Sequence, residues 1–467
     1  MKWQSPAKDD SMIFDERIII DRRSQFQNWC ESKFPSFVYS KLFDNSRNWP
    51  VSLCFAIFGF TKLIADLIQN ISALSRVGSY PLSNQKIAII FDLTRQHLPP
   101  AIPASDLEEF FFNANSDLLK SGTNSLIILN NLSEKSFQLS DRLFSYSSLN
   151  QLVLAARNGY PSKCWSLISA FYQTLTSVRM SRNFLDLSGI LPDLFEMNLF
   201  LASNLNVNTS TAFVTTSSIY SFPSVFYLNK RVRFFETEML HYSENTLPLT
   251  NKEFEEKGTP QWIFNSRVDT HKVWTNEYAK FLTSANPLLS VKVVGSMIFR
   301  PRKNSEIYKK RINQILILDV NPSTHESKNG PYTELAGKRF LDCVENVHPF
   351  LANSYSPKPI FRIKSKRRRI SAHSDKYLEH KMELIQRGIV EEVPWQSNLY
   401  SLISESAVVL CSIGTAPSLI ARELGIPVAM FYSGENELMN PLVDYGIPLL
   451  QDDAAVYSFL SSHLENL

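Results

Sequence analysis

The residues best suited to hold an anionic ligand lie in one short loop near the C-terminus. The loop follows the apolar run 407–411 and precedes a helical pattern at 416–424. A strand, a tight loop and a helix in this order present free backbone N–H groups at the helix start, which bind anions. A crossover loop without a ligand has the same local pattern, so this alternative stays open. The small or hydroxyl-bearing members of the loop are Ser412, Gly414, Thr415 and Ser418.

Basic residues follow another predicted strand, at 359–363. Lys364, Lys366 and Arg367 come directly after it. Charges at the carboxyl end of a parallel strand face the ligand crevice, so we expect these three to contact a phosphate or an acidic sugar. The alternatives are a solvated basic edge and a nuclear localisation signal.

Four residues are candidates for a general base. Asp92 and His97 follow the first buried strand, 86–91, and His241 and Glu244 lie close together further along the chain. A carboxylate or an imidazole at a strand's carboxyl end can accept a proton from an acceptor hydroxyl. Each also has an alternative reading as a capping or hydrogen-bonded side chain.

The sequence predicts chemistry without a metal or other cofactor. It contains no Asp-x-Asp, and its eight histidines lack ligand spacing. Helix N-termini and basic side chains would then neutralise a leaving phosphate. Next to His241, Ser243 and Asn245 carry groups that can hydrogen-bond an acceptor hydroxyl or, equally, form a turn.

Composition indicates a soluble two-domain protein in a reducing compartment. The 467 residues carry 48 basic and 45 acidic side chains, a balance that does not favour a general nucleic-acid binder. The five cysteines are far apart and form no CxxC pair, which favours the cytoplasm. The N-terminus lacks the apolar core of a secretion signal. The apolar segment 51–68 contains Lys62 and Asp66, so we expect a core helix or an interfacial helix rather than a membrane span.

Alternating strand and helix patterns predict an α/β fold with two mostly parallel sheets facing a cleft. Strands are predicted at 86–91, 125–130, 151–156, 212–219, 232–235 and 291–294, and then at 314–320, 359–363, 389–392, 407–411 and 428–431. The predicted parts are a helical extension at 1–84, an acceptor-side α/β domain at 85–299, a linker at 300–312, a Rossmann-like donor-nucleotide domain at 313–452 and a C-terminal helix at 453–467.

Three stretches resemble the GT-B glycosyltransferases that build bacterial capsule and lipopolysaccharide. They are TAPSLIARELGIP (415–427), FRIKSKRR (361–368) and THKVWTNEYAKFL with VKVVGSMIF (270–299); HYSENTLPL (241–249) resembles the matching first-domain loop. The resemblance covers roughly residues 210–450. It implies that Gly414, Thr415 and Ser418 contact donor phosphate and that Glu423 reaches the ribose.

The implied activity is transfer of a sugar from a nucleotide-sugar to a surface polysaccharide or lipid-linked glycan. The enzyme would work in the cytoplasm, with peripheral contact to the inner membrane and no nucleic-acid partner. Three alternatives share the architecture: a transferase of polyol phosphate from CDP-glycerol, a nucleotide-sugar epimerase, and a non-catalytic glycan-binding or nucleotide-binding scaffold.

Overall fold

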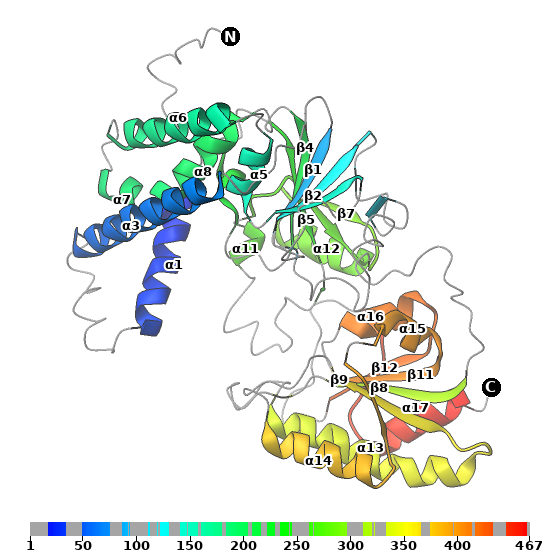
Figure 1. The fold of residues 1–467 in the computed structure, drawn as a ribbon. Coiled ribbons are helices and arrows are strands. Elements are labelled where there is room, and N and C mark those ends of the chain that lie inside the picture. Colours follow the sequence, from blue (N-terminus) through cyan, green and yellow to red (C-terminus); the bar gives the residue numbers. More distant parts are fainter. Residues whose placement is uncertain are drawn as a thin grey trace. The chain divides into compact units, whose positions relative to one another are not determined.

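The computed structural model contains two compact units, each built on a parallel sheet (Figure 1). The first unit comprises Met1–Thr94, Asp117–Leu240 and Asn265–His271, and the second comprises Arg95–Ser116, His241–Phe264 and Lys272–Leu467. The structure describes residues 17–33, 49–74, 86–91, 93, 111–112, 119, 122–129, 141–146, 148–156, 160–179, 184–203, 208–215, 222–228, 234–241, 243–244, 261–264, 266–296, 312–319, 322, 333–365, 374–395, 397–412, 416–432 and 445–464.

The first sheet has the strand order β3-β2-β1-β4-β5-β6-β7. Neighbouring strands from β3 to β5 pair in parallel. Every residue of β1, β2 and β3 is buried, as expected for parallel strands covered on both faces. The boundary between the two units falls within β6. The strands are β1 (Ile87–Phe91), β2 (Ser125–Leu129), β3 (Leu143–Tyr146), β4 (Thr209–Thr215), β5 (Glu236–Leu240), β6 (Thr270–Val273) and β7 (Ser290–Val293).

A helical layer belongs to the first unit. Within it, α3 packs against α7 and α8, and α6 packs against α8. At the α3–α7 crossing, a Cβ at Gly59 would overlap the Ser188 carbonyl oxygen, and one at Gly189 would overlap the Phe55 ring. The two helices therefore approach backbone to backbone at this point. The helices are α1 (Arg17–Lys33), α3 (Trp49–Ala73), α5 (Leu149–Ala155), α6 (Tyr160–Arg179), α7 (Phe184–Gly189) and α8 (Leu191–Ala202), followed by the 3-10 helix η6 (Ser224–Tyr227).

The second unit holds a six-stranded parallel sheet of order β10-β9-β8-β11-β12-β13. Its strands are β8 (Ile312–Asp319), β9 (Ile360–Ser365), β10 (Glu391–Val393), β11 (Ser406–Ser412), β12 (Val428–Phe431) and β13 (Leu449–Leu450). Its helices are α11 (Gln261–Phe264), α12 (Asn276–Ala285), α13 (Glu334–Ser354), α14 (Asp375–Gln386), α15 (Leu399–Ser404), α16 (Ala416–Glu423) and α17 (Asp453–Leu464).

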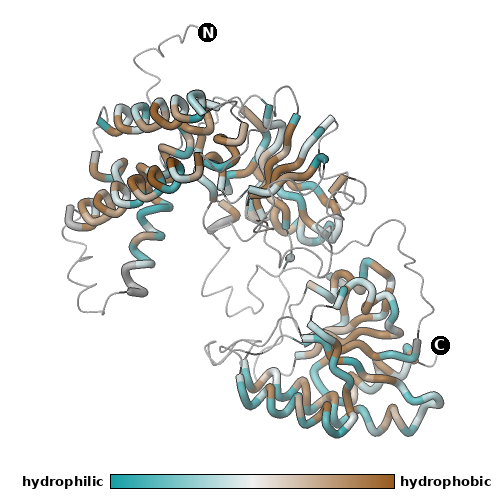
Figure 2. Tube along the Cα trace, in the orientation of Figure 1, coloured by the Kyte–Doolittle hydropathy of each residue, from teal (hydrophilic) through white to brown (hydrophobic). Residues whose placement is uncertain are grey.

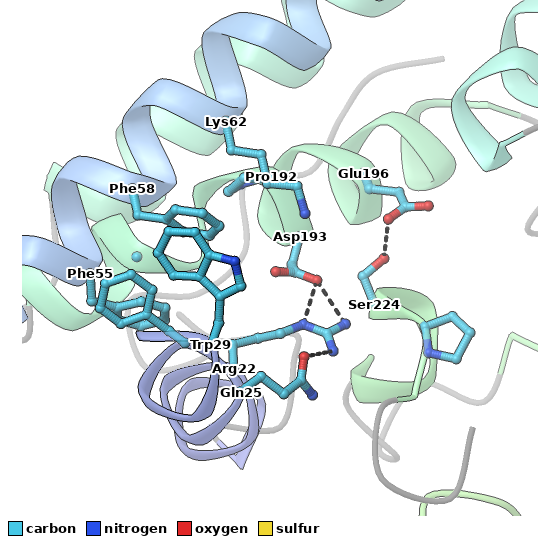
Figure 3. Close-up of a pocket in the computed structure, with 13 residues that line it drawn as sticks. Arg22, Gln25, Trp29, Phe55, Phe58, Lys62, Pro192, Asp193, Glu196 and Ser224 are labelled. Carbon is cyan, nitrogen blue, oxygen red and sulfur yellow. Dashed lines mark hydrogen bonds and ion pairs between the residues drawn. The ribbon is translucent and has the colours of Figure 1, made fainter. Parts of the chain in front are cut away.

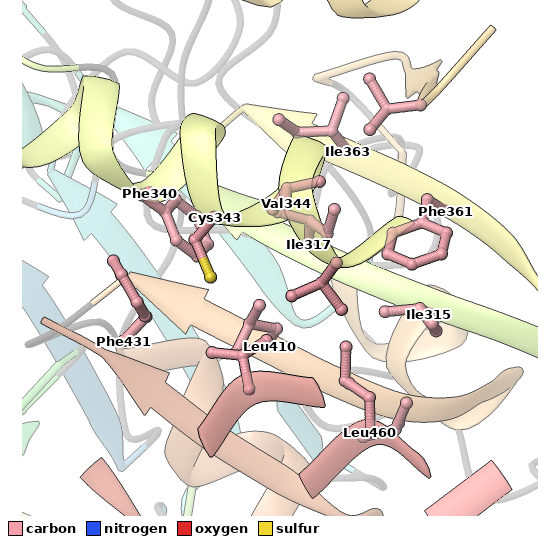
Figure 4. Packing of buried hydrophobic residues seen from close by; sticks show 14 of the residues in the cluster. Ile315, Ile317, Phe340, Cys343, Val344, Phe361, Ile363, Leu410, Phe431 and Leu460 are labelled. Atoms are coloured by element: carbon pink, nitrogen blue, oxygen red, sulfur yellow. The ribbon is translucent and has the colours of Figure 1, made fainter. Parts of the chain in front are cut away.

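Side chains of β8 alternate between two buried clusters of the second unit. Ile315 and Ile317 join α13 and α17 on one face (Figure 4), whereas Leu316 and Leu318 join α15 and α16 on the other. This alternation is the period of two of a strand whose faces are both covered. Figure 2 shows the strands of this sheet as mainly hydrophobic, with hydrophilic positions on the helices around them.

The predicted fold class is confirmed in its two parallel α/β sheets and its helical N-terminal part. The prediction of a strand at 151–156 was wrong, because α5 begins at Leu149 with Ser148 as its cap and is apolar almost throughout. A short apolar run of this kind does not distinguish a strand from a buried helix. The predicted strand at 232–235 is displaced to β5, where Glu236 and Glu238 interrupt the apolar pattern.

Candidate functional site

The loop predicted to bind the donor phosphate connects β11 to α16. Ser412 ends β11 and is half-buried, and Ser418 lies in the first turns of α16 with only 2% of its surface exposed. Gly414 and Thr415 lie outside the described residues, as do the basic residues Lys366 and Arg367. The strand–loop–helix order is thus as predicted, and the phosphate contacts stay predictions.

Charged side chains gather where β8 and β9 end. Asp319 is the last residue of β8, and Lys364 and Ser365 are the last two of β9; all three are buried. Ser365 donates a hydrogen bond to Asp319 Oδ2 at 3.4 Å, and Lys381 Nζ lies 3.8 Å from the same oxygen. Lys381 also pairs with Glu392 at 2.8 Å.

Of the three basic residues predicted to contact a phosphate, Lys364 is the one within the described part of the chain. Burial lowers the pKa of its ammonium group, and Asp319 partly opposes this shift. Its Nζ donates to the Ser365 carbonyl at 3.4 Å, which is a long bond for an ammonium group. A cation that is desolvated in this way gains from an anionic ligand, because the ligand restores charge compensation. Lys364 is therefore suited to contact a phosphate at this edge of the sheet.

The C-terminal end of α16 is anchored within the second unit. Glu423 Oε2 accepts a hydrogen bond from the Ser296 backbone N–H at 3.3 Å and a short one from the Ser296 hydroxyl. Arg422 pairs with Glu277 at 2.9 Å, donates to the Tyr445 carbonyl, and lies 5.8 Å from the centre of the Tyr445 ring. Glu423 Oε2 thus already accepts hydrogen bonds from Ser296, and the contact of Glu423 with a ribose stays a prediction.

Glu244 caps the start of α12. Its Oε1 accepts from the backbone N–H groups of Trp274 (2.7 Å) and Thr275 (3.0 Å), and its Oε2 accepts from the Thr275 hydroxyl at 2.7 Å. Burial raises the pKa of Glu244, and these donors oppose the shift. The described contacts give this carboxylate an anchoring role.

His241 and Ser243 are buried beside this cap. The His241 ring is fully buried, with its centre 5.5 Å from that of Tyr278, and its carbonyl accepts a hydrogen bond from the Trp274 indole N–H at 2.5 Å. Ser243 is also buried. Asp92, His97 and Asn245 lie outside the described residues. The identity of the general base therefore stays a prediction, and so do the acceptor contacts of Ser243 and Asn245.

Among the described residues, one group has the spacing of metal ligands. His380 lies 3.6 Å from Asp342 and 3.4 Å from Glu345, in the contact between α13 and α14. Arg387 already pairs with Glu345 at 2.5 Å. These contacts, with Arg387 and Glu345 as an ion pair, form a polar network that joins two helices.

The first unit contains a cavity of about 420 Å³ that sequence reasoning missed (Figure 3). One wall is aromatic: Phe26, Trp29, Phe55 and Phe58, from α1 and α3, have ring centres 5.3–6.2 Å apart. Trp29 keeps 47% of its surface exposed.

The opposite wall of the cavity is polar. Arg22 pairs with Asp193 at 2.9 Å, and the Ser224 hydroxyl donates to Glu196 at 2.8 Å. Burial raises the pKa of Glu196 to about 7. Asp193 and Glu196 lie three residues apart in α8, which is mostly apolar, so both face one side of the helix. That spacing is the signal in the sequence that could have indicated this wall.

The sequence matches the family described as polysaccharide biosynthesis PFTS motif protein over residues 190–460, more than half of its length. The chain belongs to this family. The predicted role in polysaccharide biosynthesis is thereby confirmed. The match covers parts of both units, including β4, η6 and all strands of the second sheet. No curated protein matches the chain.

Several solved structures are partly similar to this family member. The wall teichoic acid polymerase TagF has a TM-score of 0.42 at 9% identity, with 87% of this chain and 89% of that chain covered. An E. coli trehalose-6-phosphate structure bound with UDP-2-fluoro glucose has a TM-score of 0.40 at 12% identity, with 81% and 95% covered. S. aureus TarM in complex with UDP and α-GlcNAc-glycerol has a TM-score of 0.33 at 12% identity, with 58% of this chain covered. This chain spans about half of the length of TarM (55%) and of the pneumococcal O-GlcNAc transferase GtfA (53%).

Proposed function

We propose that the protein is a glycosyltransferase that moves a sugar from a nucleotide-sugar to a polysaccharide or lipid-linked glycan. The observation that carries the proposal is the family match, which assigns the chain to polysaccharide biosynthesis. The parallel sheet of the second unit adds a suitable place for the donor. Ligands of such sheets bind outside the carboxyl ends of the strands, where Lys364, Ser412 and the start of α16 all lie.

The proposed reaction uses charge at this edge. An acceptor hydroxyl loses its proton to a general base, its oxygen bonds to the anomeric carbon, and the bond from that carbon to the phosphate oxygen breaks. The negative charge that develops on the leaving phosphate is stabilised by the first backbone N–H groups of α16 and by Lys364. In this proposal neither a metal ion nor another cofactor takes part, and the base comes from the predicted set Asp92, His97, His241 and Glu244.

The donor site is tested by nucleotide-induced thermal stabilisation. Wild-type protein should be stabilised by at least one of the UDP-, GDP-, CDP- or CMP-linked sugars, and Lys364→Met should lose that shift. Lys358→Met is the matched control, because Lys358 is exposed just before β9, at the amino end of the same strand. Absence of a shift with every nucleotide would remove the proposal, as would an equal loss in both variants.

Product analysis separates the remaining alternatives. A glycosyltransferase requires an acceptor and releases the nucleotide. An epimerase releases an isomer without any acceptor, and a polyol-phosphate transferase acts on CDP-glycerol. A scaffold binds without turnover.

We further propose that the protein works in the cytoplasm with peripheral contact to the inner membrane through α3. By its length and apolar composition, Val51–Ala73 of this helix could cross a membrane, and only 33% of its most apolar stretch is buried. Lys62 and Asp66 interrupt the segment, which favours a helix lying in the interface. An apolar stripe runs along its exposed side: Leu53, Ile57, Phe60, Ile64, Ile68 and Ile71.

A further inference from the structure

The cavity of the first unit combines two walls of different chemistry in one volume that is partly open to solvent. Aromatic rings from α1 and α3 form one side, and Arg22, Asp193, Glu196 and Ser224 form the other (Figure 3). Its volume of about 420 Å³ lies within the range of small-molecule sites, roughly 300–1,000 Å³. An apolar lining with a few convergent polar groups is the usual make-up of such a site.

The polar wall is connected to the carboxyl end of the first sheet. Phe91 is the last residue of β1, and its ring packs edge-on against Phe226 of η6 with centres 5.6 Å apart. The same short helix supplies Ser224, which donates to Glu196. Parallel sheets bind their ligands at the carboxyl ends of the strands. The cavity therefore lies beside the edge where a ligand is expected.

The charges of the cavity argue against a phosphate ligand. Arg22 and Lys62 bring two cations, and Asp193 and Glu196 bring two carboxyl groups. Asp193 already pairs with Arg22 at 2.9 Å. A phosphate would meet carboxylates without a surplus of positive charge, whereas a neutral polyhydroxylated ligand can donate to the carboxylates and accept from the cations.

We propose that this cavity binds a saccharide, with the ring stacked on Trp29 and Phe58 and its hydroxyl groups directed to Arg22, Asp193 and Glu196. This assignment rests on the proposed glycosyl transfer, in which the saccharide is the acceptor glycan. A pyranose has an apolar C–H face that suits an aromatic side chain and an equatorial set of hydroxyls that suits a polar wall.

Protonation of Glu196 tunes this binding. Ser224 donates to its carboxylate, and Asp193, Arg22 and Lys62 are the charged groups around it. The pKa of Glu196, raised by burial to about 7, places its titration in the neutral range. The ionised form accepts from a sugar hydroxyl, whereas the protonated form donates to one, so affinity should change between pH 6 and pH 8.

The test is saturation-transfer NMR on the full chain with a panel of neutral and acidic mono- and disaccharides. We expect transfer to at least one sugar, an affinity at least tenfold lower in Trp29→Ala, and no change in Trp165→Ala. Trp165 is the matched control because it is 70% exposed on α6 and does not line the cavity. Glu196→Gln should bind with an affinity that is constant between pH 6 and pH 8. Absence of transfer to every sugar at tens of millimolar, or an equal effect of the two tryptophan variants, would overturn the proposal.

A parallel measurement separates this inference from the proposed function. Trp29→Ala should keep the thermal shift with the donor nucleotide, because Trp29 belongs to the first unit and the donor edge to the second. If wild type binds a nucleotide but no saccharide, the inference fails and the proposed function stands. If wild type binds a saccharide but no nucleotide, the proposed function fails and the cavity assignment stands.

Discussion

Two ionisable residues of the first unit make the stability of the folded state depend on pH. Glu196 and His271 both have pKa values displaced by burial, in directions that favour the neutral form of each side chain. The free energy of unfolding depends on pH between the folded and the unfolded pKa of each such group, because the two states bind different numbers of protons there. Each group gives a separate prediction with an opposite sign.

Ionisation of Glu196 should lower the free energy of unfolding as the pH rises. Its folded pKa of about 7 lies above the ordinary value of 4.5, so the folded state binds the proton more tightly. The contribution of Glu196 to the free energy of unfolding should therefore be greatest below pH 4.5 and be lost as the pH rises through 7, by at most about 3 kcal/mol. Glu196→Gln should lack this fall. Urea unfolding at pH 5 and pH 8 measures it, and a fall of equal size in the variant would contradict the prediction.

The buried neutral His271 should lower the free energy of unfolding as the pH falls. It is fully buried with Nε2 2.8 Å from the Ser266 hydroxyl, and burial lowers its pKa to about 4. The unfolded state then binds more protons between pH 6.5 and pH 4, so up to about 3 kcal/mol of stability is lost over that interval. We expect a shallower loss in His271→Asn and an unchanged loss in His463→Asn, a control at the end of α17. Circular dichroism during acid titration reports the difference.

At the scale of elements, the start of α12 is held by a network of capping hydrogen bonds in the second unit. Glu244 accepts from two backbone N–H groups there and from the Thr275 hydroxyl, and Thr275 in turn caps the helix by accepting from the Tyr278 N–H at 3.1 Å. Trp274, only 4% exposed, packs in the same cluster as β8 and α16. Local capping and core packing therefore depend on one short segment.

Removing either member of this cap should destabilise the second unit. Glu244→Ala leaves two backbone N–H groups without their acceptor, and Thr275→Ala removes the N-cap, so each should cost about 1–3 kcal/mol. Because both act in one network, the double variant should cost less than the sum of the two. Urea unfolding of the four proteins measures the coupling energy, and strict additivity would show that the two residues act independently.

Helices and strands with a clear apolar pattern in the sequence were predicted. Those whose position depends on contacts between distant segments were not. The strands β8, β11 and β12 and the helices α13 and α14 were predicted because apolar periodicity or continuous apolar runs mark them. The strand β13 has only two residues, Leu449 and Leu450, and no local pattern announces it. The cavity was missed because its walls come from α1, α3, α8 and η6, segments whose proximity is decided by tertiary packing.

At the scale of the whole molecule, the exposed side of α3 presents an apolar stripe to solvent. Ile57 is 58% exposed and Ile64 is 54% exposed, and both lie on the stripe of the proposed membrane contact. Burying an isoleucine side chain contributes about 1.5–3 kcal/mol. Two such side chains are enough to change partitioning by at least a factor of ten.

Vesicle co-sedimentation should show this contact. Wild-type protein should bind vesicles that contain anionic lipid, and the double variant Ile57→Asn, Ile64→Asn should bind at least tenfold more weakly. The control is Leu335→Asn, Phe350→Asn, which removes two apolar side chains that are 54% and 65% exposed on α13. Equal binding by all three proteins would exclude α3 as the contact.

The crossing of α3 and α7 links the stability of the helical layer to the width of the cavity. Gly189 lines the cavity and faces Phe55, which forms part of the aromatic wall, while Gly59 meets the chain at Ser188 and Gly189. A methyl group at position 59 would force the two helices apart and carry the aromatic rings away from the carboxyl groups of α8. One added carbon atom at the helix crossing would thus set how large a ligand this pocket admits.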